Sequence, residues 1–174
     1  MHKDSHATIS DTQVATFDYD DLSIVWQHRT WGDAPDRKYP WAYILYGERG
    51  TLKANVQGYE FIPRGQGEPI HQECLFEREE YPEDLTEDGM ELHAAPASRR
   101  HMLDFLAAIE TGARPVADIE EGHISSVSCI LANLAMETGR ALQYDPETRE
   151  VKGDAEATDL LLRPYRNPWR HPAA

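Results

Sequence analysis

The chain has 174 residues, of which 40% are hydrophobic, and this suits one domain with a single core. Its 31 acidic and 17 basic residues give a formal net charge of -14, which repels nucleic acids and anionic membranes, so neither is an expected partner. No apolar run reaches the roughly 20 residues that a membrane-spanning helix needs. Cys74 and Cys129 lack C-x-x-C spacing and a preceding secretory segment, which predicts a cytoplasmic protein with reduced thiols.

The first half of the chain predicts a mostly antiparallel sheet. Residues 1–10 are polar and are expected to form a disordered or extended leader, and residues 11–174 a single domain. From about 12 to 80, short runs rich in β-branched and aromatic residues alternate with turn signals. The predicted strands are 14–19, 22–31, 43–46, 51–56, 59–62 and 73–77. Alternation in the second strand places Leu22, Ile24, Trp26 and His28 on one face.

The second half predicts helices, at about 98–140 and 154–162. Ser98 is a good N-cap for the first helix, and Gly112 is suited to end it. Asp118 is an acidic start for the next helix, which Gly139 ends, and the last helix begins at Asp154. Strands followed by helices indicate an α+β fold, an open, mostly antiparallel β-sheet with helices packed on one face.

Motifs of nucleotide chemistry are missing from the sequence. The nearest approach to a G-x-G-x-x-G turn is Gly65-Gln66-Gly67, but a strand rather than a helix is expected after it. No P-loop, G-x-S-x-G elbow or H-E-x-x-H pair occurs, and His71, His93 and His101 lack metal-ligand spacing. We therefore expect no catalytic, cofactor-binding or metal residues in this chain.

Three segments nonetheless resemble one enzyme family. They are DTQVATFDYDDLSIVWQHRTWG, HMLDFLAAIETGARPVADIEEGHISSVSCILANLAMETGRALQYDP and GDAEATDLLLRPYRNPW. Together they are similar to the carboxy-terminal domain of Gfo/Idh/MocA oxidoreductases. More narrowly, they resemble the bacterial branch that ends in Tyr-Arg-x-Pro-Trp, here Tyr165, Arg166, Pro168 and Trp169. The resemblance covers about residues 11–171.

The resemblance implies a two-domain dehydrogenase of sugar metabolism. In such an enzyme an amino-terminal Rossmann domain holds NAD(P), while the carboxy-terminal sheet backs a sugar-like substrate and pairs subunits. The family's Gly-rich turn, Glu-Lys-Pro segment and Asp-x-x-x-His pair are absent from this sequence. We therefore expect a truncated frame, an excised domain or a free-standing relative that binds no NAD(P) alone.

Two functions follow as expectations. In the first, the chain is a substrate-side and oligomerisation domain that pairs with a second copy through its sheet face, or with a separate cofactor-binding chain. In the second, it is a stand-alone enzyme or enzyme subunit that acts on a sugar or polyol by acid-base chemistry with its own histidines. Whether the chain is itself an enzyme stays open at this point.

Four residues are candidates for substrate contact. His28, Arg29 and Trp31 lie in the run WQHRTW, which could offer an aromatic platform beside polar groups, although a packed sheet face is the favoured interpretation. His123, near the start of the second helix, could face a pocket, although a structural histidine is more common there.

Overall fold

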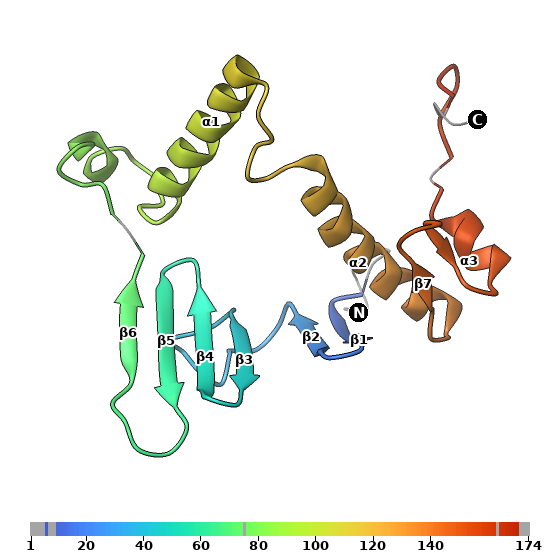
Figure 1. Cartoon of the computed structure of the whole chain (residues 1–174), viewed down its shortest axis with the longest axis horizontal. Coiled ribbons are helices and arrows are strands. Elements are labelled where there is room, and N and C mark those ends of the chain that lie inside the picture. Colours follow the sequence, from blue (N-terminus) through green and yellow to red (C-terminus); the bar gives the residue numbers. More distant parts are fainter. Residues whose placement is uncertain (1–5, 7–9, 75, 163, 171–174) are drawn as a thin grey trace. The chain divides into compact units, whose positions relative to one another are not determined.

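The computed structural model describes residues 6, 10–74, 76–162 and 164–170, and they fall into two compact units, 1–116 and 117–174. The first unit (Figure 1) contains strands β1 (Thr12–Asp18), β2 (Ser23–Arg29), β3 (Tyr43–Gly47), β4 (Gly50–Asn55), β5 (Gly58–Pro63) and β6 (Ile70–Glu73), the 3-10 helix η1 (Pro82–Leu85) and helix α1 (Ala94–Thr111). The second contains α2 (Ile119–Thr138), β7 (Tyr144–Asp145), β8 (Glu150–Val151) and α3 (Ala155–Leu160).

All paired strands of the described chain are antiparallel, in three sheets of order β1-β2, β3-β4-β5-β6 and β7-β8. The α+β fold class with open antiparallel sheets is thereby confirmed. The single domain at 11–174 stays a prediction, and the expected leader at 1–10 lies almost wholly outside the described residues.

Five predicted strands are present with small shifts at their ends, but the sixth is misplaced. The prediction at 73–77 shares only Glu73 with β6. The ladder with β5 runs from Ile70 opposite Phe61 to Glu73 opposite Gly58. Beyond it, Glu77 accepts hydrogen bonds from Arg99 and Arg100 of α1, at 3.3 and 2.8 Å. These ion pairs hold Glu77 with α1, outside the ladder.

The register of the four-stranded sheet separates a polar face from an apolar face. Alternation along paired strands puts every second residue on the same side. One side, the polar face, carries Lys53, Asn55, Glu60, His71 and Glu73, together with Ile44, Tyr46, Thr51 and Ile62 towards β3. The opposite side, the apolar face, carries Tyr43, Leu45, Leu52, Ala54, Tyr59, Phe61, Pro63 and Ile70, with Gln72 as its one polar amide.

Gly50 allows the turn between β3 and β4 to close under an aromatic ring. Its φ is +154°, a conformation that favours glycine, and a Cβ there would lie 2.9 Å from the Phe61 ring and 2.3 Å from the carbonyl oxygen of Ile62. Any side chain at position 50 would therefore displace Phe61 and strain the backbone.

Helix α1 begins earlier than predicted. Its N-cap is His93 rather than Ser98, and Pro96 lies in its first turn, where the missing N–H of proline costs no helical hydrogen bond. The other helix ends agree with the sequence. Gly112 and Gly139 end α1 and α2 in the left-handed conformation, and Asp118 accepts from the N–H groups of Glu120 and Glu121 at 2.7 and 3.3 Å. None of the helices within the described ranges is long and apolar enough to cross a membrane.

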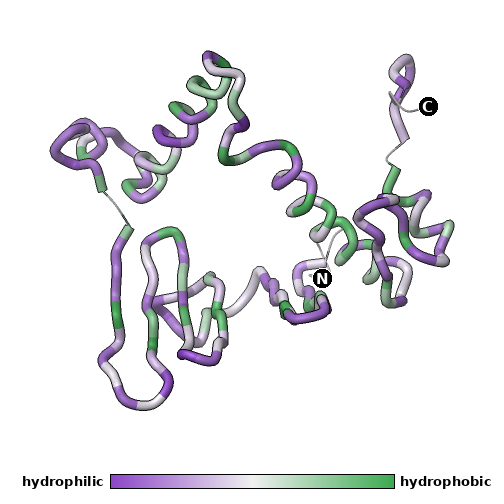
Figure 2. Tube along the Cα trace, in the orientation of Figure 1, coloured by the Kyte–Doolittle hydropathy of each residue, from purple (hydrophilic) through white to green (hydrophobic). Residues whose placement is uncertain are grey.

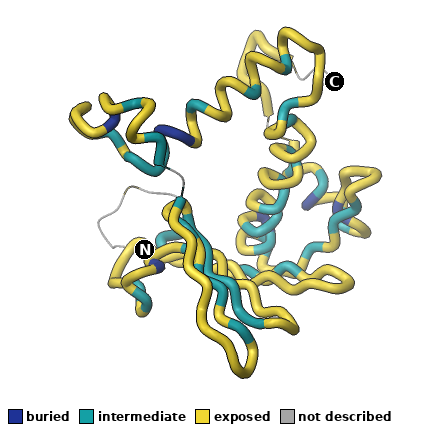
Figure 3. Tube along the Cα trace, turned by 60° about the vertical axis from the view of Figure 1, so that its left-hand side comes forward, coloured by how far each residue is buried: buried dark blue, intermediate teal, exposed yellow. Residues whose placement is uncertain are grey.

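Burial in the first unit is shallow. Every residue of β2 and β3 is exposed, and Figure 3 shows long exposed stretches along the strands. Figure 2 shows hydrophobic and hydrophilic residues side by side along the trace of the first unit. Large apolar side chains therefore face outward, among them Leu45 at 55%, Val25 at 61% and Tyr43 at 69% exposure.

An ion-pair cluster fastens η1 to α1. Arg99 donates two hydrogen bonds to Asp84, at 3.1 and 2.6 Å, and its guanidinium lies 3.7 Å from the centre of the Tyr81 ring. The charge-assisted bonds from Arg99 lower the pKa of Asp84, a carboxylate that is only 6% exposed. The acidic run 81–91, whose composition predicts a solvated surface loop, is anchored to the helix in this way.

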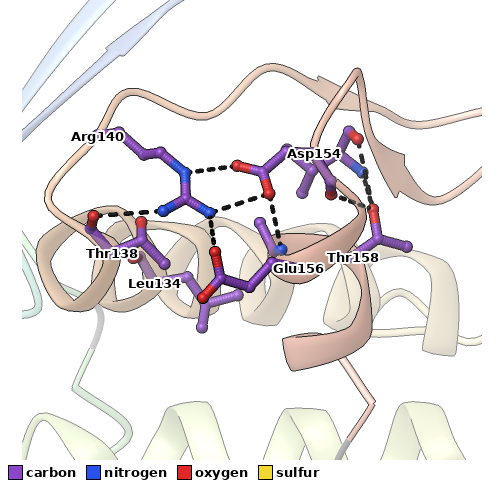
Figure 4. A network of polar contacts seen from close by, with 8 residues as sticks. Leu134, Thr138, Arg140, Asp154, Glu156 and Thr158 are labelled. Atoms are coloured by element: carbon purple, nitrogen blue, oxygen red, sulfur yellow. Dashed lines mark hydrogen bonds and ion pairs between the residues drawn. The ribbon is translucent and has the colours of Figure 1, made fainter.

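The second unit has a small core around α3. Leu134, Val151 and Ala157 are buried there. Figure 4 shows Arg140 donating to Asp154 at 2.6 and 3.0 Å and to Glu156 at 2.6 Å. Because β7–β8 pairs only two residues on each strand, these side-chain bonds add a connection between the end of α2 and the start of α3.

Candidate functional site

A short loop, 36–39, lies over the polar face of the four-stranded sheet. Asp36 pairs with Lys53 of β4 at 2.8 Å, and Lys38 pairs with Glu60 of β5 at 3.3 Å. The hydrogen bond between Asp36 and Lys53 lowers the pKa of the carboxyl and raises the pKa of the ammonium group. Both groups therefore stay charged at neutral pH, and the loop is tied to two strands.

Tyr39 is the residue that this loop buries. It is 8% exposed, and the ammonium groups of Lys38 and Lys53 lie 5.4 and 5.6 Å from the centre of its ring. Its hydroxyl is buried, and within the described part of the chain it has no hydrogen-bond partner. A buried hydroxyl without a partner is uncommon and asks for a physical explanation.

A cavity of about 480 Å³ opens beside Tyr39 on the polar face. This volume is within the range of small-molecule sites. The sheet contributes Asn55, Gly58, His71 and Glu73 to its lining, and the rest comes from loops. Those loop residues are Lys38, Tyr39, Gln57, Phe76, Arg78, Leu92 and His93.

The loop that follows β6 contributes Arg78, the cation of the cavity whose charge is least neutralised by carboxylates. The guanidinium of Arg78 lies over the Phe76 ring, 4.4 Å from its centre, within the range of a cation–π contact. Across the described residues no carboxylate pairs with Arg78, whereas Lys38 is already paired with Glu60. Arg78 is therefore the group in this cavity that is most available to an anion.

A second cavity, of about 190 Å³, adjoins the first. The two share Asn55, Gln57 and His93, and the smaller one is also lined by Trp41. Trp41 is 61% exposed, so its ring offers an open apolar surface next to the polar groups. The combined lining offers an aromatic surface, amide groups, two imidazoles, the carboxylates of Glu73 and Glu91, and the cations of Lys38 and Arg78.

Three of the four predicted contact residues lie elsewhere, on or next to the β1–β2 hairpin. Trp31 donates from its indole N–H to the Thr12 hydroxyl at 3.0 Å, and Arg29, which pairs with Thr12 in register, donates to the Asp33 carbonyl at 3.4 Å. His28 lies on the other face of β2, with Trp26. The structure therefore brings Arg29 and Trp31 together at one end of the hairpin, separate from His28.

His123, the fourth predicted contact residue, is half-buried on α2 and lines neither of these two cavities. Its contact with a substrate stays a prediction, as do those of His28, Arg29 and Trp31.

Sequence reasoning missed the cavity residues because they come from distant segments. Lys38 and Tyr39 precede β3, Arg78 follows β6, and His93 precedes α1. One signal was available: alternation in β4 to β6 predicts that Asn55, His71 and Glu73 share a face once the register is known.

The described residues offer little that could hold a phosphate-bearing cofactor or a metal ion. The Asp118 carboxylate already accepts hydrogen bonds from N–H groups at the N-terminus of α2, and its negative charge would repel a phosphate. Over the ranges that the structure describes, no cluster of three or more His, Cys, Asp or Glu side chains could hold a metal ion.

Comparison with known proteins gives one match. Residues 77–171 match the family model described as "Oxidoreductase family, C-terminal alpha/beta domain", of the Gfo/Idh/MocA type. No curated protein and no solved structure matches the chain. The matched segment contains α1, α2 and α3 and more than half of the 174 residues. The chain therefore belongs to the Gfo/Idh/MocA oxidoreductase family, as a C-terminal alpha/beta domain.

Proposed function

We propose that this chain is the substrate-side and oligomerisation domain of an NAD(P)-dependent oxidoreductase of sugar metabolism, acting in the cytoplasm. Hydride transfer needs a bound nicotinamide held against the substrate. The 174 residues contain no Gly-rich turn between a strand and a helix, so a nucleotide-binding domain outside them would supply that step. The role of this domain is then to form one wall of a substrate site and to join copies of the enzyme.

The observation that carries the oligomerisation role is the apolar face of the sheet. Its members include Tyr43 at 69%, Leu45 at 55% and Ile70 at 55% exposure. No charged residue occurs among the side chains that the register places there. Exposed apolar areas of this kind in soluble proteins are typical of interaction surfaces.

The lack of charged residues on the apolar face allows a second copy to occupy it. Two chains with a net charge of -14 each repel one another over most of their surfaces. The apolar face carries no charged residue, so that repulsion is smallest there, and its exposed apolar side chains would gain from burial. A two-fold pairing of identical faces satisfies both conditions.

The test replaces one residue on each face of the same strand. Leu45→Glu places a charge on the apolar face, so we expect the dissociation constant of the dimer to rise about 100-fold or more, as for an unpaired buried charge. Sedimentation equilibrium over a range of protein concentrations measures this change.

Ile44→Glu is the matched control. Ile44 is adjacent on β3, is 45% exposed and lies on the opposite face, with Lys53. We expect this variant to self-associate like the unmodified chain. A chain that is monomeric at all concentrations, or equal weakening by both substitutions, would refute pairing through the apolar face.

A further inference from the structure

We propose that the β1–β2 hairpin pairs with the free edge of the four-stranded sheet in a second copy of this chain, with β2 lying antiparallel to β3. The inference deepens the oligomerisation role proposed above and rests on that role for its purpose. It uses the backbone edges of the strands, whereas the pairing proposed above uses the apolar face. All the elements involved belong to the first unit.

Strand β3 forms a free edge of the sheet, because in the described structure it pairs with β4 on one side only. Hydrogen-bonded pairs alternate with non-bonded pairs along an antiparallel ladder. The N–H of Arg64 donates to the carbonyl of Arg49 at 2.9 Å, which sets this alternation between β4 and β5 and, across β4, between β4 and β3. By that count Leu45 is bonded to β4, whereas Ile44 and Tyr46 direct their N–H and C=O groups away from the sheet.

Strand β2 offers a matching edge. The N–H of Thr30 donates to the carbonyl of Asp11 at 3.0 Å, which sets the alternation along the β1–β2 ladder. The N–H and C=O groups of Val25 and Gln27 therefore point away from β1. Every residue of β2 is exposed, and a two-stranded hairpin is only marginally stable by itself in water. A further strand beside β2 would satisfy these groups and stabilise the hairpin.

The side chains also match once the two edges are joined. Residues that face each other across an antiparallel pair lie on the same side of the sheet, so Val25 placed opposite Ile44 extends the polar face. The alternate residues of β2, Ile24 and Trp26, then extend the apolar face beside Leu45. Ile24 is 41% and Trp26 54% exposed in the single chain, so this contact would bury part of both side chains. The backbone alone dictates this alignment, and it joins apolar side chains to apolar side chains.

Charge does not oppose the contact. Natural edge strands are commonly protected against pairing by charged residues, proline or bulges. Strand β3, with the sequence YILYG, contains no charged residue and no proline, and neither do residues 23–27 of β2, SIVWQ. The two strands therefore lack the local repulsion that a net charge of -14 imposes elsewhere.

A second copy is the occupant that the structure favours. Within one chain, β1–β2 and β3–β6 form separate sheets, and the connection between them contains the loop 36–39. Two ion pairs, Asp36 with Lys53 at 2.8 Å and Lys38 with Glu60 at 3.3 Å, fasten this loop over the polar face. Both edges thus stay unpaired in the described single chain, and a reciprocal exchange of hairpins about a two-fold axis pairs both.

Amide hydrogen exchange of the full chain, followed by NMR at several protein concentrations, tests the exchange of hairpins. Val25→Pro removes an outward N–H of β2 and keeps the ladder with β1, because proline is tolerated where the N–H of an edge strand faces solvent. Val14→Pro is the matched control: it removes an outward N–H from the β1 edge, and the two valines are 64% and 61% exposed. As the concentration rises, we expect exchange at Ile44 and Tyr46 to slow at least about 10-fold in the parent and in Val14→Pro, but not in Val25→Pro.

Inner amides of the hairpin report whether each variant is folded. Ala15 and Trp26 form a bonded pair by the same count, so their amides should stay protected in both proline variants. If Val25→Pro disturbs them, Gln27→Pro repeats the test at the next outward position of β2.

Three results would overturn the inference. Slow exchange at Ile44 and Tyr46 that is independent of concentration but lost in Val25→Pro would place the hairpin on its own β3. Equal rates in the parent and Val25→Pro would show that β2 does not pair, and an equal loss in Val14→Pro would show that the β2 edge is not the one used. Pairing of the apolar faces alone would slow exchange equally in both proline variants, so this proposal can fail while the Leu45→Glu test still succeeds.

Discussion

Asp154 has two roles in the second unit, as the N-cap of α3 and as a partner of Arg140. Its carboxylate accepts from the N–H of Ala157 at 3.0 Å while it receives the guanidinium of Arg140 at 2.6 Å. The hydrogen bond from Arg140, followed by the bond from Ala157, lowers its pKa to about 2 from an ordinary value of 3.8. The folded state thus favours the charged form.

This shift predicts how stability depends on pH. Because the pKa of Asp154 is lower in the folded state, its stabilising effect is complete above the unfolded pKa and disappears as the pH falls from about 4 to 2. Asp154→Asn keeps a good N-cap and loses the charge, so we expect it to be less stable than the parent at pH 7 and equal to it near pH 2. Urea unfolding at pH 7, 4 and 2 measures the difference.

Asp154→Ala serves as the comparison, because alanine removes both the cap and the charge. It should be the least stable of the three chains at pH 7 and should stay below Asp154→Asn at pH 2. A constant gap between the parent and Asp154→Asn across the pH range would contradict the assigned pKa.

Single residues show what a sequence can and cannot reveal. The glycine stops at Gly112 and Gly139 and the cap at Asp118 were predicted, because each acts on backbone within a few residues. The pairs of Arg99 with Asp84 and of Lys53 with Asp36 were not predicted. They join residues 15 and 17 positions apart, so they become visible only when the chain is folded.

At the scale of elements, Thr158 connects α3 to β8. Its hydroxyl accepts from the N–H of Val151 at 2.9 Å, and Val151 is 4% exposed. A two-residue strand pair is marginal without such support. Thr158 therefore fastens the smallest sheet to the helix beside it.

Thr158→Val keeps the shape of this side chain and removes the hydroxyl. We expect a loss of about 1–3 kcal/mol in the free energy of unfolding, since a buried N–H is left without a partner. Chemical denaturation measures it, and Thr148→Val in the exposed turn of the same hairpin is the control. No difference between the two variants would show that the Thr158 bond does not stabilise the unit.

Elements with strong alternation were predictable, and those decided by distant contacts were not. The strand at 23–29 and its division of side chains between two faces follow from period-two alternation. The strand at 70–73 and the early start of α1 at Ala94 do not, because partners outside each segment select these boundaries.

At the scale of the whole molecule, the proposed role, in which another domain binds the nucleotide, predicts how tightly this chain binds NAD(P). We expect the 174-residue chain to bind NADH and NADPH no more tightly than about 100 μM, a free energy near -5.5 kcal/mol. Titration followed by nicotinamide fluorescence measures it, with an intact two-domain oxidoreductase as the positive control. Tighter binding would reveal a cofactor site within these residues and would favour a stand-alone enzyme.

Membership of the family could be inferred from the sequence, and the match over residues 77–171 confirms it. The cavity could not, since its walls come from four separate parts of the chain. Family resemblance thus indicates what kind of domain this is, and the arrangement of side chains indicates where to look for its ligand.

The opposed faces of the four-stranded sheet limit how its strands can change in length. Inserting one residue into β4 would exchange the two sets of side chains beyond it, turning Lys53 and Asn55 toward the apolar side and Leu52 or Ala54 toward the cavity. An insertion at 64–69, between β5 and β6, would leave every pairing intact. Variation in length among related chains should therefore gather in that loop, and the strands around the cavity should keep a constant number of residues.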